Sequence, residues 1–168
     1  MKYEIKPVQM SKARDEAEKT LIRLLFQEDS PWRKPIFSFV KAEEFQNPHL
    51  KSVMTYLEKC DKDNKAISFN QVLNHFREKE EIVRLLSQLM REALPETVDH
   101  SQLGLDCVLH INGVEIQDKI HQLQSEIKAA EKNNQDSSPL TQEWLNLKKT
   151  YKNIREETIA EWKKTVEI

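Results

Sequence analysis

Two apolar stripes placed symmetrically about residue 135 constrain the fold of this chain more than any other feature of its sequence. In each stripe, apolar residues recur at alternating steps of four and three, which is the spacing of a helix that packs along a narrow seam against a second helix. The first stripe consists of Ile116, Ile120, Leu123, Ile127 and Ala130, and the second of Leu140, Trp144, Leu147, Tyr151 and Ile154. We expect the two helices to pack against each other.

The segment between the stripes is made of turn-forming residues. Residues 133–139 read Asn-Asn-Gln-Asp-Ser-Ser-Pro, in which Ser138 is the predicted N-cap and Pro139 the first residue of the second helix. Reflection about the midpoint pairs Ile127 with Trp144 and Ile120 with Tyr151. The pattern therefore predicts an antiparallel helical hairpin with arms of about 30 Å at 1.5 Å per residue.

Composition favours an all-α fold and argues against several functions. Charged residues make up 32% of the 168 residues, and there are only 2 glycines, too few for the turns of a β-sandwich or an α/β enzyme. Lys and Arg number 26 against 28 Asp and Glu, which does not fit a dedicated duplex-DNA-binding protein. No apolar run reaches the roughly 20 residues of a membrane span. The two cysteines, Cys60 and Cys107, are best read as reduced thiols.

The part of the chain before the stripes predicts a helical bundle. Helix starts are indicated by Asn47–Pro48, by a capping box at Ser68–Gln71 and by a weaker one at Asp99–Gln102. In the helix predicted from Ser11, the apolar residues are expected to face the core and the charged ones to face solvent. The apolar set is Ala17, Leu21, Leu24 and Leu25, and the charged set is Arg14, Asp15, Glu18 and Arg23.

Three segments follow from these patterns. Residues 1–10 lack periodicity and are expected to form a linker from upstream domains, residues 11–112 a helical bundle, and residues 113–168 the hairpin with a C-terminal extension. Glycine costs about 1 kcal/mol in a helix interior relative to alanine. Because Gly113 lies at the junction, we predict a hinge there, although an ordinary surface glycine explains the residue equally well.

The C-terminal extension carries apolar residues that the hairpin seam does not explain. After Ile154 the pattern shifts register to Ile159, Trp162 and Val166. One interpretation is an exposed apolar strip that contacts a partner. The other is that Trp162 packs back on the bundle.

No catalytic chemistry is indicated by the sequence. Two isolated glycines cannot form a phosphate-binding loop. Cys107 and His110 lie three residues apart, but no second ligand pair accompanies them, and no carboxylate pair sits in an apolar context. We therefore predict no catalytic residue, no cofactor and no metal site.

Several segments together resemble a known family. They are Glu18–Leu25, Glu43–Phe45 shortly before His49 and Leu50, Leu105–Leu109, Ile120–Glu131 and Leu145–Lys149. Their order, over about residues 17–154, resembles the C-terminal helicase-binding domain of bacterial DnaG-type DNA primases. The resemblance implies a globular helical bundle, similar to the N-terminal domain of the replicative helicase, followed by a long helix and an antiparallel helical hairpin.

The resemblance also implies a function. The hairpin would bind the N-terminal domains of the hexameric replicative helicase, recruit primase to the replication fork as part of the primosome, and modulate both activities. The chain itself would not be an enzyme, because primer synthesis would reside in upstream domains of the parent DNA primase. It would be cytoplasmic and bacterial, with no membrane partner and little direct nucleic-acid binding.

Three alternatives stay open from the sequence. The chain could be a helicase N-terminal domain, which would need a glycine-containing turn that residues 76–86 lack. It could bind nucleic acid through Lys148, Lys149, Lys152 and Arg155, although Glu156 and Glu157 interrupt this run. It could also be an oligomerisation hairpin that swaps between chains at Gly113, whereas we expect a monomer.

Contact residues for the helicase are predicted from expected exposure and position. The predicted contact set consists of Lys119 and Glu126 on the first arm and of Lys152, Arg155, Glu156, Ile159 and Trp162 on the second. A small, partly polar contact of this kind predicts a weak and transient complex.

Overall fold

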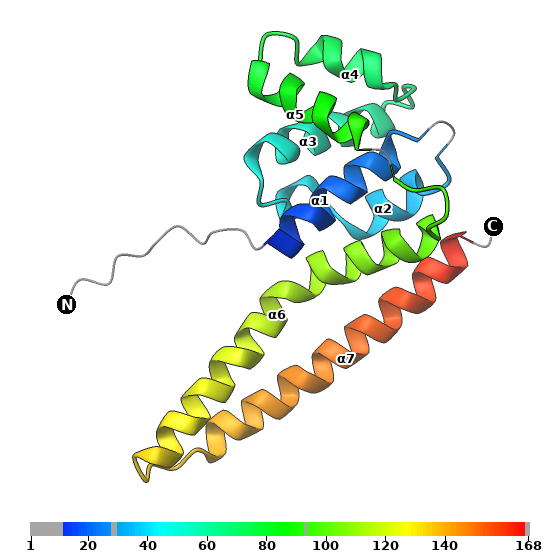
Figure 1. Cartoon of the computed structure of the whole chain (residues 1–168). Coiled ribbons are helices and arrows are strands. Elements are labelled where there is room, and N and C mark those ends of the chain that lie inside the picture. The colour runs from blue at the N-terminus through cyan, green and yellow to red at the C-terminus, as the bar shows by residue number, and fades with distance from the viewer. Residues whose placement is uncertain (1–11, 28–29, 93, 167–168) are drawn as a thin grey trace. The chain divides into compact units, whose positions relative to one another are not determined.

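The computed structural model describes residues 12–27, 30–92 and 94–166, and every regular element in these ranges is a helix (Figure 1). The predicted all-α class is therefore confirmed. The linker expected at residues 1–10 lies outside the described residues. The helices are α1 (Lys12–Leu25), α2 (Arg33–Phe39), the 3-10 helix η1 (Ala42–Glu44), α3 (Pro48–Lys62), α4 (Phe69–His75), α5 (Glu80–Arg91), α6 (His100–Lys132) and α7 (Ser138–Val166).

The chain divides into two compact units, Met1–Ile111 and Asn112–Ile168. This division falls beside the expected boundary between residues 112 and 113. Helix α6 begins in the first unit and ends in the second.

The core of the first unit forms around α1, which packs against α2, α3 and α5. Many of its apolar residues are 0% exposed, in line with the sequence pattern. They include Leu21, Leu24 and Leu25 of α1, Ile36 of α2, Leu50 and Leu57 of α3, and Leu86 of α5. Burying a side chain of this size stabilises the fold by about 1.5–3 kcal/mol. Helix α3 also packs against η1 and α5, so α1 and α3 together organise this core.

Local side-chain hydrogen bonds set the predicted helix starts. The Asn47 side chain accepts hydrogen bonds from the backbone N–H groups of His49 and Leu50, with Pro48 opening α3. Ser68 accepts one from the N–H of Gln71, and Asp99 accepts two, from Ser101 and Gln102. These groups satisfy backbone donors that a helix start leaves free.

Arg14 and Glu18 form a buried ion pair in the core of the first unit, so the prediction that both side chains face solvent is wrong. Glu18 is 0% exposed and Arg14 is 4% exposed, and Arg14 Nε lies 2.9 Å from Glu18 Oε2. The Glu18 carboxylate also accepts hydrogen bonds from the backbone N–H groups of Gln46 at 3.1 Å and Asn47 at 3.0 Å. The carboxylate is thus fully engaged, which offsets the cost of burying its charge.

Arg14 uses its remaining donors to join three elements. Its guanidinium donates to the carbonyl oxygen of Ile111 in α6 at 3.0 Å and to that of Glu44 in η1. One side chain of α1 therefore holds η1 and the first part of α6. Residues 14, 18, 21 and 25 follow steps of four, three and four, so Arg14 and Glu18 share a helix face with the buried Leu21 and Leu25. This spacing could have predicted their burial, but their charge suggested a position in solvent.

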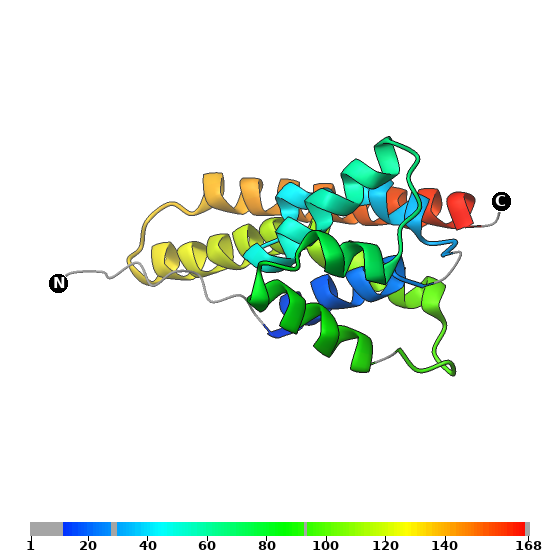
Figure 2. The same cartoon turned by 90° about the horizontal axis from the view of Figure 1, so that it is seen from above.

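The second unit is the predicted antiparallel hairpin. The C-terminal half of α6 and the first half of α7 run side by side and join at a short turn in both views (Figures 1 and 2). Asn134 in this turn has a φ of 54°, a conformation that asparagine tolerates better than most residues. Ser138 is the first helical residue rather than the cap, because the Ser137 carbonyl accepts the hydrogen bond from Thr141 N–H at 2.9 Å. The Asp136 carboxylate accepts one from Ser138 N–H, which lowers the pKa of Asp136.

The hairpin seam uses the predicted stripes, with a local change in pairing. Ile120, Leu123 and Ala130 are buried, whereas Ile154 at the far end is 36% exposed. Gln117 donates a hydrogen bond to the Tyr151 hydroxyl at 2.9 Å. A Cβ atom built on Gly113 would lie 2.8 Å from Tyr151 Cε2. Tyr151 therefore contacts Gly113 and Gln117, whereas the sequence predicted that it pairs with Ile120. The ring occupies the space beside Gly113, which has no side chain.

The close contact of Tyr151 gives Gly113 a packing role. Helix α6 continues through Gly113 without interruption. The hinge predicted at this residue stays a prediction.

Replacing Glu18 tests the buried ion pair. Glu18→Gln leaves the Arg14 charge buried without its counter-charge, so we expect a loss of about 3 kcal/mol or more in the free energy of unfolding. The matched control is Glu16→Gln on the same helix, where the carboxylate is 54% exposed, and it should change stability by less than about 0.5 kcal/mol. Urea unfolding of both variants gives the answer, and equal losses would contradict the assigned role.

His110 in α6 predicts a loss of stability in mild acid. Burial, and then the charge of Arg14, lower the pKa of His110 below its ordinary value of 6.5. As the pH falls below that value, the unfolded chain takes up a proton that the folded chain resists, so the folded state loses stability. His110→Gln should flatten the decline in unfolding free energy between about pH 7 and 5. Parallel pH profiles of the two proteins would contradict this.

A double-mutant cycle tests the contact between Gly113 and Tyr151. In a Tyr151→Ala background, Gly113→Ala should stabilise the chain by about 1 kcal/mol, because alanine favours the helix. With Tyr151 present, overpacking of about 1–3 kcal/mol should cancel or reverse that gain. Thermal unfolding of the four proteins measures the coupling energy. A gain of the same size in both backgrounds would mean that Tyr151 is not the reason for the glycine.

Candidate partner-binding surface

The predicted contact residues of the second unit differ in their exposure. Lys119, Glu126, Lys152, Arg155 and Glu156 are exposed, and Ile159 is half-buried. None of these five charged side chains forms an ion pair with another described residue. They are therefore available to a partner.

The exposure expected for Trp162 is wrong. Its side chain is 1% exposed, and Thr158 one turn before it is 8% exposed. This burial contradicts the interpretation in which Trp162 belongs to an exposed apolar strip. Trp162 is thus a structural residue rather than an exposed anchor for a partner.

The predicted contact residues do not share one face of the hairpin. Lys119 and Glu126 immediately precede the seam residues Ile120 and Ile127, whereas Lys152 and Ile159 follow Tyr151 and Thr158. In an antiparallel pair of helices, positions that precede the seam on both helices lie on one side and positions that follow it lie on the other. A flat partner could therefore meet only one of the two groups.

The side formed by α7 carries an apolar residue that sequence reasoning missed. Leu145 is 50% exposed, the highest exposed fraction among the large apolar side chains of the described chain. Steps of seven connect Leu145, Lys152 and Ile159, which places them along one line of the helix. The signal in the sequence was that Leu145 falls outside the four-and-three spacing of the seam.

We name this surface the α7 stripe and define it as Leu145, Lys148, Lys152, Arg155 and Ile159. The Lys148 ammonium lies 4.4 Å from the centre of the Trp144 ring, a cation–π contact that orients this lysine. Apolar groups stand at the two ends of the stripe and cations stand between them. Such a surface suits a partner with apolar contacts and negative charge.

Metal-binding and nucleophilic groups were sought throughout the described residues. No group of three or more His, Cys, Asp or Glu residues in the described ranges could hold a metal ion. Burial raises the pKa of the Cys107 thiol to about 12, so this thiol stays protonated at neutral pH and is a poor nucleophile. Within the same ranges, no helix has both the length and the apolar character that crossing a membrane requires.

Comparison with known proteins identifies the family. The model of the family described as "DNA primase DnaG DnaB-binding" matches residues 18–142, which is more than half of the chain. Comparison with curated proteins finds no match, and neither does comparison with solved structures. The matched segment begins within α1, includes α2 to α6 and the first residues of α7, and ends before the α7 stripe. The chain therefore belongs to the family of DnaB-binding domains of the DNA primase DnaG.

Proposed function

We propose that this chain recruits DNA primase to the replicative helicase at the fork, and that the α7 stripe makes the contact. Membership of the DnaB-binding family supports a helicase as the partner. In this proposal the chain makes no primer itself, acts as a monomer and modulates helicase and primase activity through binding.

The α7 stripe supports this proposal better than the full predicted contact set. It extends over 14 helical steps from Leu145 to Ile159, or about 21 Å at 1.5 Å per residue. Lys152 and Arg155 are exposed and form no ion pair with another described residue, so binding would break no internal interaction of their charges. Leu145 can supply buried apolar area at the contact.

The size of this surface also predicts the strength of the complex. Interfaces that bury little area and keep a polar rim form weak or transient complexes. A primase that must be recruited repeatedly needs a complex of this kind. Lys119 and Glu126, on the other side of the hairpin, would then contribute little.

Two matched charge reversals test which side of the hairpin binds. The whole chain is titrated calorimetrically into the N-terminal domain of the replicative helicase from the same source. Arg155→Glu, in the stripe, should weaken binding at least about 10-fold, equivalent to 1.4 kcal/mol. Lys119→Glu, an equally exposed cation on the opposite side, should change affinity less than about 2-fold, which is within the small effect of a peripheral charge.

Two controls complete this experiment. Leu145→Ser should weaken binding with little change in its salt dependence, because it removes apolar contact rather than charge. Circular dichroism and thermal unfolding should show that all three variants stay folded. If Lys119→Glu lowers affinity and Arg155→Glu does not, the contact lies on the other side, and if the intact chain does not bind, the proposal fails.

A further inference from the structure

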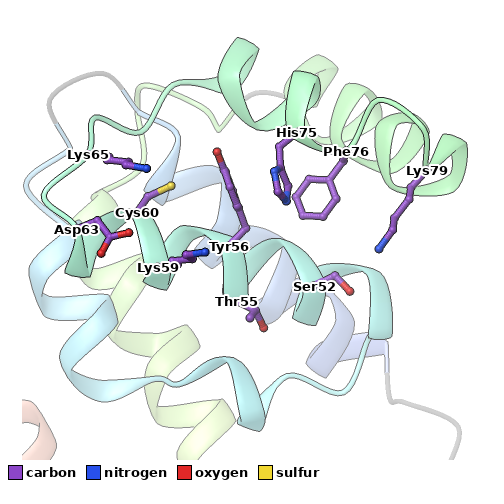
Figure 3. Close-up of a pocket in the computed structure, with 10 residues that line it drawn as sticks. All are labelled: Ser52, Thr55, Tyr56, Lys59, Cys60, Asp63, Lys65, His75, Phe76 and Lys79. Carbon is purple, nitrogen blue, oxygen red and sulfur yellow. The ribbon is translucent and has the colours of Figure 1, made fainter.

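The first unit contains a second feature that the α7 stripe does not explain, a hollow of about 610 Å³ (Figure 3). Helix α3 forms one wall of the hollow with one face, which includes Thr55, Tyr56 and Lys59. The opposite wall comes from His75 at the end of α4, from Phe76, and from Lys79 before α5. Its volume lies within the range of ligand sites, about 300–1,000 Å³.

Positive charge gathers around this hollow although the chain as a whole has a net charge of −2. Lys59, Lys65 and Lys79 line it together with one carboxylate, Asp63. None of the three ammonium groups forms an ion pair with another residue in the described ranges. Figure 3 shows Lys59 and Lys65 on one side of the Tyr56 ring and Lys79 on the other. The hollow is therefore a local anion-attracting site.

Stacked aromatic rings stand inside the same hollow. The rings of Tyr56 and His75 lie face to face, with centres 3.9 Å apart and planes 18° apart. Phe76 meets both rings edge-on, at 5.8 Å from Tyr56 and 4.8 Å from His75. These contacts hold the rings as one fixed wall onto which another flat group could stack.

We propose that this hollow binds a short stretch of single-stranded nucleic acid. Lys59, Lys65 and Lys79 would contact backbone phosphates, and a base would stack against the wall formed by Tyr56 and His75. Cations beside aromatic rings are the combination by which proteins bind single strands without reading their sequence. An acidic peptide would use the lysines but would have no need of the stacked rings.

The sequence analysis led us to expect little direct nucleic-acid binding, and this proposal replaces that expectation with weak binding of a single strand. That expectation came from the overall charge balance, which reports on proteins that cover long stretches of duplex. Three local cations suffice for a few phosphates of a single strand. The binding should be weak, independent of base sequence and strongly dependent on salt.

The test uses the whole chain labelled with ¹⁵N and an oligothymidylate of about ten nucleotides at about 50 mM salt. Amide shift changes should centre on residues 52–79. Fluorescence anisotropy then compares two triple variants. Lys59→Gln with Lys65→Gln and Lys79→Gln should weaken binding at least about 10-fold and reduce the slope of log K against log salt by about 2.

The matched control removes three exposed lysines that belong neither to the hollow nor to the α7 stripe, through Lys51→Gln, Lys149→Gln and Lys163→Gln. It should leave the affinity within about 2-fold, since these lysines do not line the hollow. Tyr56→Leu should weaken binding about 5-fold or more without changing the salt slope, because stacking is not ionic. The lysine variants keep the test valid if Tyr56→Leu fails to fold.

Three results would overturn the proposal. The first is the absence of shift changes at residues 52–79. The second is equal loss of affinity in the two triple variants, which would place binding on dispersed lysines that include those of α7. The third is binding of hexaglutamate through the three lysines of the hollow when the oligothymidylate does not bind, which would identify a site for an acidic peptide.

Discussion

The buried ion pair between Arg14 and Glu18 is the interaction on which the rest of the first unit depends. Glu18 holds the backbone of Gln46 and Asn47, and Asn47 in turn caps α3. Arg14 holds η1 and the carbonyl of Ile111, where the first unit ends. A buried charge is costly unless it is fully paired, so α1, η1, the backbone of Gln46 and Asn47, and the part of α6 around Ile111 must be in place together. The same pair therefore sets the position of α3, whose outer face lines the hollow.

The sequence was most informative where regular spacing and short-range hydrogen bonds determine structure. The two stripes predicted the hairpin, and Asn47, Ser68 and Asp99 predicted helix starts, because both signals depend on residues close in the chain. Patterns of polarity failed for Arg14 and Glu18, since a charged residue is expected at the surface unless its partners are known. The packing of Tyr151 on Gly113 and the burial of Trp162 depend on residues that spacing alone does not bring together.

For the predicted contact set, too, the sequence indicated which residues are exposed but not which of them lie on one surface. Exposure was predicted correctly for its five charged residues, but the division of these residues between two sides of the hairpin needs the antiparallel arrangement. Leu145 was missed because the sequence analysis followed only the seam residues, and Leu145 lies outside their spacing. The three lysines of the hollow were missed because residues 59, 65 and 79 come from α3, from the loop after it and from the link to α5. The two cationic surfaces lie in different units, so a primase could contact a helicase and a single strand through separate side chains.

Backbone hydrogen exchange of the intact chain would show whether the α7 stripe contacts the helicase. The rates are measured with and without the N-terminal domain of the replicative helicase. If the α7 stripe makes the contact, exchange should slow in α7 between residues 145 and 159 and change little at residues 52–79. Binding that protects only the first unit, or that leaves residues 145–159 unchanged, would contradict this contact.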